Sequence, residues 1–164
     1  MRFPLRSLSV FLPVALVLPA ALAPAATKTA KFNVTATVQS DCTVTATNLA
    51  FGTVGIIQAN VDATSTITVT CTPNTAYQLG LNEGTTAGST VDGRLLANGT
   101  STLQFQLFND SQRTQVWGNT NGVNTVGGSG TGTASNFTVY GRIPPQAPPK
   151  VGNYATEITA TITY

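Results

Sequence analysis

Apolar and polar residues alternate one by one along several stretches of this chain, and this pattern most restricts the folds open to it. In residues 65–72, Ile67, Val69 and Cys71 alternate with threonines. Such a period of two places the apolar side chains on one face of a β-strand, and threonine suits the solvated face because it is β-branched and polar. We find no convincing amphipathic helix after residue 25. The sequence therefore predicts an all-β sandwich or barrel.

Further stretches share this alternation and are separated by Gly, Asn and Pro. We expect strands in residues 30–38, 42–46, 49–55, 77–81, 103–108, 137–141 and 158–164. Residues 94–96 form a brief apolar element before Asn98-Gly99, a pair typical of hairpin turns. Residues 119–136 are almost wholly Gly, Asn, Ser and Thr, which predicts a long flexible loop or a pair of poorly ordered strand ends. Seven or eight strands suit an immunoglobulin-like sandwich.

The first 25 residues have the order of a secretory signal peptide. A short basic stretch precedes an apolar run, and small residues follow that end in an Ala-x-Ala pair. We expect cleavage after Ala25. A membrane anchor is the alternative, but the run from Leu8 to Leu22 is shorter than the roughly 20 residues needed to span a bilayer, and two prolines interrupt it. The mature chain then consists of an N-terminal segment, residues 26–38, and one domain, residues 39–164.

Loss of this leader changes the charge balance. The full chain has 8 Lys and Arg against 6 Asp and Glu, and the leader carries Arg2 and Arg6. The mature chain is therefore neutral, and the sequence offers no basic patch for nucleic acid or an anionic membrane.

The two cysteines, Cys42 and Cys71, have a structural role in this interpretation. Export places them in an oxidising compartment, where a disulfide is the default state. A metal site is the alternative, but two cysteines without any histidine are a poor ligand set. A catalytic cysteine would lack its histidine partner.

The chain shows no pattern typical of an enzyme or of a cofactor site. It contains no histidine, so serine and cysteine triads that use one are excluded. Its six carboxylates are scattered, mostly in turn contexts, where such residues usually cap or solvate. The Gly-rich residues 119–136 lack the spacing of a phosphate-binding loop. We expect neither an enzyme nor a bound cofactor or metal.

The function that we assign to this chain depends on what residues 30–38 pair with. Its even positions are apolar and its odd positions are polar, so it predicts a strand with one buried face. A strand near a chain end can pair with its own domain or with that of a neighbour. The apolar positions are Ala30, Phe32, Val34, Ala36 and Val38.

A set of short motifs in a fixed order resembles a known family. They are the alternating stretch before Cys42, Asp41-Cys42-Thr43-Val44, Leu49-Ala50-Phe51-Gly52-Thr53, Val69-Thr70-Cys71-Thr72, Arg94-Leu95-Leu96, Trp117-Gly118, Val139-Tyr140-Gly141-Arg142-Ile143-Pro144, and Gly152-Asn153-Tyr154 before a terminal Thr-Ile-Thr-Tyr. Each motif is weak alone, but their order and spacing resemble the spore coat protein U domain family, which includes subunits of archaic chaperone–usher pili.

This resemblance implies a mechanism of assembly. Such pilins have an incomplete immunoglobulin-like fold that lacks its last strand. A periplasmic chaperone lends a strand to the groove, and an outer-membrane usher exchanges it for the N-terminal strand of the next subunit. By resemblance, Ala30, Phe32, Val34, Ala36 and Val38 would be the plugs of this donor strand. The chaperone would bind the last strand, whose inward residues are Ile158, Ala160, Ile162 and Tyr164.

We therefore expect a structural subunit of a surface fimbrium, made of this chain or of related subunits, that serves adhesion and biofilm formation. One alternative is a secreted coat or envelope protein whose residues 30–38 fill its own groove. Another is a surface-binding adhesin module, although tip subunits of this type usually add a separate binding domain. An edge-strand aromatic is an equal alternative for Tyr164. We expect Trp117 to lie in the core or line the groove, and Arg142 to anchor a strand end.

Overall fold

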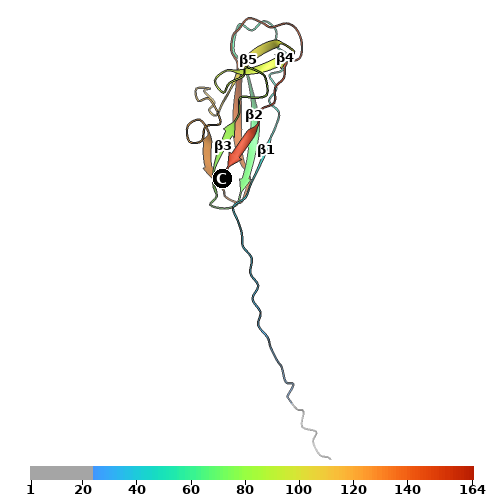
Figure 1. The fold of residues 1–164 in the computed structure, drawn as a ribbon, viewed down its shortest axis with the longest axis vertical. Coiled ribbons are helices and arrows are strands. Elements are labelled where there is room, and N and C mark those ends of the chain that lie inside the picture. The colour runs from blue at the N-terminus through green and yellow to red at the C-terminus, as the bar shows by residue number, and fades with distance from the viewer. Residues whose placement is uncertain (1–23) are drawn as a thin grey trace, which may run out of the picture. The chain divides into compact units, whose positions relative to one another are not determined.

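The computed structural model describes residues 24–164 and shows an all-β protein, as predicted. Most of the predicted leader lies outside the described residues. The strands form a five-stranded antiparallel sheet in the order β1-β2-β7-β5-β4 and a three-stranded sheet in the order β6-β3-β8 (Figure 1). Their bounds are β1 Cys42–Ala46, β2 Val61–Cys71, β3 Ala76–Leu81, β4 Arg94–Asn98, β5 Ser101–Phe108, β6 Val126–Ser129, β7 Ser135–Ile143 and β8 Ala160–Thr163. Across residues 24–164, no helix is long and apolar enough to cross a membrane.

The core lies between the two sheets and is built from the alternating residues of the central strands. Inward residues of β2 and β5, such as Val69 and Phe105, are buried, while the residues between them are half-buried or exposed. Trp117 is 1% exposed, and its indole Nε1 donates a hydrogen bond to the Leu79 carbonyl at 2.9 Å. The placement of Trp117 in the core is therefore confirmed. Its hydrogen bond also satisfies the one polar atom that a buried tryptophan brings.

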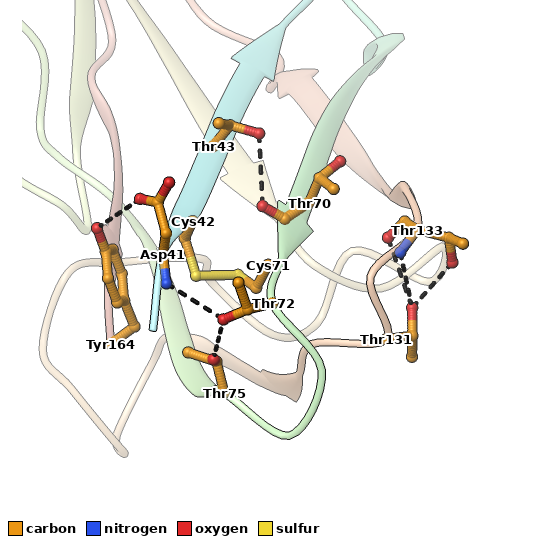
Figure 2. Close-up of a disulfide and its surroundings, with 10 residues drawn as sticks. All are labelled: Asp41, Cys42, Thr43, Thr70, Cys71, Thr72, Thr75, Thr131, Thr133 and Tyr164. Carbon is orange, nitrogen blue, oxygen red and sulfur yellow. Dashed lines mark hydrogen bonds between the residues drawn. A yellow bond between two sulfur atoms is a disulfide. The ribbon is translucent and has the colours of Figure 1, made fainter. Parts of the chain in front are cut away.

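The predicted disulfide joins Cys42 at the start of β1 to Cys71 at the end of β2 (Figure 2). The two residues are direct partners in the antiparallel register, with their Cα atoms 4.1 Å apart. Because β1 pairs with β2 alone, this bond fixes an edge strand to the interior of its sheet. The disulfide prediction is confirmed.

The alternating pattern did not predict that Arg94 is buried. It begins β4 and is fully buried. Its guanidinium donates five hydrogen bonds of 2.6–3.1 Å, and every acceptor is uncharged. Burial lowers the pKa of Arg94 to about 10, so the group is still protonated at neutral pH. The acceptors are the carbonyls of Leu81, Asn82, Val91 and Trp117 and the side-chain oxygen of Gln106.

Arg142 anchors the end of a strand, as expected. It is the register partner of Asp62 across β2 and β7, and its Nε and Nη2 atoms bind the two carboxylate oxygens at 2.8 and 2.9 Å. The hydrogen bond from Arg142, aided by its charge and by that of Arg113, lowers the pKa of Asp62. This carboxylate therefore has a structural partner.

Residues 119–136 contain strand ends, one of the two predicted alternatives, since β6 within them pairs with β3 and β7 begins at Ser135. Two strand predictions need correction. Residues 49–55 form no strand, because their apolar side chains pack inward while their backbone joins no sheet. Residues 30–38 also form no strand. A strand needs a partner for its backbone, and a single chain gives this stretch none.

Candidate strand-acceptor groove

A groove opens to the core between residues 46–57, which begin at the end of β1, and residues 148–160, which lead into β8. Its volume is about 1260 Å³. Its floor reaches the core, because Leu103, Phe105 and Val139, all at most 5% exposed, line it. Lys150 and Glu157 are the charged residues that the described structure places along it. An open apolar channel beside unpaired backbone is a site that another extended segment can complete.

Beyond the residues that line the groove, the start of β1 lies beside the end of β8, and we call this place the closed end (Figure 2). The Tyr164 hydroxyl and Asp41 Oδ1 lie 3.4 Å apart and form a hydrogen bond across the gap. Asp41 is also held from the β2 side, since its amide donates to Thr72 Oγ1 at 3.2 Å and its carbonyl accepts from the Thr72 amide at 2.9 Å. Together with the Cys42 disulfide, these bonds fix the point at which the N-terminal segment joins the domain.

The open end of the groove is flanked by two segments without regular structure. We call residues 47–57 the wall segment and residues 148–156 the rim segment; both line the groove. Within residues 24–164, the backbone of residues 48–55 forms no hydrogen bond to other backbone groups. These amides and carbonyls add to the unpaired edge beside the groove.

Side chains of the wall segment pack over the five-stranded sheet. Leu49, Phe51 and Val54 are half-buried, and Phe51 meets Phe105 edge to face with ring centroids 6.1 Å apart. Gly141 of β7 makes this approach feasible. A Cβ atom at Gly141 would lie 2.9 Å from Leu49 Cδ1 and 3.0 Å from Phe51 Cζ, which is closer than real Cβ contacts allow. Alternation with Phe137 and Val139 places Gly141 on the inward face of β7, but it does not show which segment packs against that position.

Only two of the four residues predicted on the last strand line the groove. Ile158, Ala160 and Ile162 are half-buried, and Tyr164 is 55% exposed. The intervening residues 157, 159, 161 and 163 are exposed, so the predicted alternation is present. Ile158 and Ala160 line the groove directly. Their partial exposure, with β8 paired to β3 alone, is typical of a strand that lacks one neighbour.

Four of the five predicted plugs, Ala30 to Ala36, lie in a segment that the structure describes separately from the domain, whereas Val38 belongs to the domain unit that begins at Thr37. All residues from 30 to 38 are exposed. Phe32 is 83%, Val34 is 84% and Val38 is 85% exposed. Three such apolar side chains at alternate positions form a stripe that a single chain leaves in water.

Comparison with known proteins places the chain in a family. The model of the Spore Coat Protein U domain matches residues 28–161. Over 158 residues the chain is 35% identical to Protein U of Myxococcus xanthus, which covers 87% of this chain and 88% of that protein.

Among solved structures, the chain resembles one in the crystal structure of the CsuC-CsuE chaperone-tip adhesion subunit pre-assembly complex from archaic chaperone-usher Csu pili of Acinetobacter baumannii. The TM-score is 0.59 at 21% identity, and the likeness spans 78% of this chain and 41% of that one. At this identity the likeness concerns the fold alone, which is the predicted immunoglobulin-like sandwich. With its fold and its match over residues 28–161, the chain belongs to the Spore Coat Protein U domain family.

Proposed function

We propose that this protein is a structural subunit of a chaperone–usher fimbrium and polymerises by donor-strand exchange. The groove between the wall and rim segments carries the proposal, because it exposes an apolar floor beside the unpaired backbone of residues 48–55. Membership of the family and a fold like that of a chain in a chaperone–subunit complex support it. Residues 30–38 of one copy would fill the groove of the next.

The dimensions of the donor and the groove agree. Residues 30–38 span eight steps, or about 26 Å at about 3.3 Å per residue in an extended strand. The edge offered by residues 157–163 spans six steps, or about 20 Å. The amides of Asn82 and Thr85, which follow β3, donate hydrogen bonds to the carbonyls of Thr159 and Glu157. The pairing with the β3 side therefore continues beyond β8 to residue 157. The donor is therefore long enough to cover the whole edge.

Burial of the plugs supplies the driving force. Full burial of a Phe or Val side chain stabilises by about 1.5–3 kcal/mol, and Phe32, Val34 and Val38 start more than four-fifths exposed. New backbone hydrogen bonds to the edges of the groove add about 0.5–1.5 kcal/mol each. A filled groove is thus favoured strongly enough for a stable polymer.

The same physics explains the partners that we assign. An exported subunit with an empty groove would aggregate through its apolar floor. A periplasmic chaperone that lends a strand would cover the floor and contact Ile158, Ala160, Ile162 and Tyr164. An outer-membrane usher would then catalyse the exchange for the donor strand of the next subunit. The assembled fimbrium would lie on the cell surface and serve adhesion and biofilm formation.

A second candidate function is a self-complemented coat or envelope protein, in which residues 30–38 fill the groove of their own chain. The likeness to Protein U and the description of the family favour it. The same groove and the same plugs would serve both arrangements, so only the origin of the donor strand differs.

The test introduces a charge at the plugs. We expect the double variant Phe32→Asp/Val34→Asp to give a soluble, chaperone-bound subunit that forms no polymer, because a buried unpaired carboxylate is costly. A matched control, Asn33→Asp/Thr35→Asp, adds the same charge at the polar positions and should polymerise. Polymers are measured as a heat-sensitive ladder on a denaturing gel run without boiling. A normal ladder from the plug variant, or a lone monomer from the unmodified chain, would contradict the proposal.

A further inference from the structure

The connection between the donor segment and its own domain is very short. Only residues 39–41 separate Val38, the last plug, from Cys42, the first residue of β1. Four extended steps reach at most about 14 Å. If Val38 lies in the groove of a neighbour, as the proposed function requires, the two domains cannot stand apart. Their facing surfaces must therefore meet close to this connection.

The direction of the donor strand decides which surfaces meet. The Tyr164–Asp41 contact places the end of β8 beside the start of β1, so these strands run in opposite directions. An inserted strand is therefore antiparallel to one edge and parallel to the other. Antiparallel pairing is the more stable per residue, and residues 157–163 form a longer edge than the five residues of β1. A donor antiparallel to β8 has Ala30 at the closed end and Val38 at the open end.

Exposed apolar residues lie at both ends of the groove. In the described domain from Cys42 onward, the large exposed apolar residues are Ile56, Val123, Val151 and Tyr164. Ile56 and Val151 belong to the wall and rim segments of the open end. Tyr164 lies at the closed end, beside the residue that precedes Cys42. Single exposed apolar residues are ordinary, but here three of the four lie where a short connection would bring two copies together.

We propose that consecutive subunits form a second contact, in which Ile56 and Val151 of the acceptor domain pack against Tyr164 of the subunit that donates the strand. The occupant of this surface is thus a second copy of the same chain. Tyrosine suits such a junction, because its ring supplies apolar area while its hydroxyl keeps the hydrogen bond to Asp41. The contact would limit the bending of the polymer at each connection.

Photo-crosslinking of full-length protein in its assembled polymer tests this contact. Three variants carry p-benzoylphenylalanine, at Tyr164, at Val151 and, as a matched control, at Val123, which is 78% exposed but lies in the turn of residues 120–124. Purified polymers are irradiated, boiled in detergent and mapped by mass spectrometry. We expect a dimer band from the first two variants several-fold stronger than from the control. The adduct of the Tyr164 variant should map to peptides that contain Ile56 or Val151.

Each other outcome has a defined meaning. Polymers without a dimer adduct from Tyr164 and Val151 would overturn the second contact and leave the proposed function intact. An adduct between the Tyr164 peptides of two copies would overturn it too, because it requires a donor parallel to β8. If the Tyr164 variant alone fails to assemble, the Val151 variant decides the question. Its adduct should map to the peptide that contains Tyr164, and an adduct that maps elsewhere would overturn the second contact. Absence of polymers from all variants and from the unmodified chain would overturn both proposals.

Discussion

Replacement of Arg94 by methionine should strongly destabilise the domain. The guanidinium donates five hydrogen bonds to uncharged acceptors, and all five are lost in Arg94→Met. Bonds that involve a charged group contribute about 1.5–3 kcal/mol each, so five contribute at least roughly 7 kcal/mol. Against this, burial lowers the pKa of Arg94 to about 10, which corresponds to a cost of roughly 3 kcal/mol for holding the charge. The expected net loss is about 4 kcal/mol.

Urea unfolding measures this loss directly. Trp117 is the single tryptophan, and its carbonyl accepts one of the Arg94 bonds at 2.7 Å, so its fluorescence reports on this region. At a typical slope of about 2 kcal/mol per molar urea, the midpoint should fall by about 2 M. The matched control is Arg142→Met, which removes a partly exposed ion pair with Asp62 and should cost less than about 1 kcal/mol. A midpoint for Arg94→Met equal to that of the control would refute the reasoning.

Three further predictions concern stability and the groove. Replacement of both Cys42 and Cys71 by alanine opens a loop of 29 residues and should lower the free energy of unfolding by about 3.5 kcal/mol in the chain-entropy model, and an unchanged thermal midpoint would contradict this. Because Arg142 lowers the pKa of Asp62, the ionised pair stabilises above the unfolded pKa of about 3.9 and is lost as pH falls through the lower folded value. Urea titrations should show that the unmodified protein loses stability between pH 5 and pH 2.5, and that Asp62→Asn reduces this loss by less than about 1 kcal/mol. An equal loss of stability in the variant would count against this prediction. Gly141→Val should displace the wall segment and weaken polymer formation while the far sheet stays protected in hydrogen exchange, so normal polymers would exclude this role.

Much of the fold was predictable because side-chain alternation reports directly on which face of a strand is buried. Of residues 65–72, all but Thr72 fall within β2, and residues 103–108 fall within β5. Asn98-Gly99 lies at the β4–β5 turn, where Gly99 has a φ of 62°. The disulfide followed from export and cysteine count. Each of these signals is local in the chain, which is why one sequence was enough.

The failures have a shared physical cause, which is that hydrogen-bond partners distant in the chain leave no local pattern. The wall segment alternates like a strand, yet its backbone lies beside an empty groove and has no ladder to join. β6 is a strand despite its Gly-rich sequence, because β3 supplies its partner. Arg94 begins an otherwise apolar element, and no neighbouring residue in the sequence indicates that four backbone carbonyls and one side-chain amide oxygen accept its hydrogen bonds.

The candidate site was predictable on one side only. Alternation in residues 158–164, read with the family resemblance, predicted an edge strand that reaches the groove at Ile158 and Ala160. The role of residues 30–38 as plugs stays a prediction. The second edge, β1 with the wall segment, depends on packing against Gly141 and could not be inferred from a pattern.

An electron cryomicroscopy structure of the assembled polymer tests the central claim most directly. We predict density for residues 30–38 of one subunit along β8 of the next, with Ala30 at the closed end and Val38 at the open end, near Phe105. A structure in which residues 30–38 fill the groove of their own chain, or in which the groove stays empty between subunits, would contradict it.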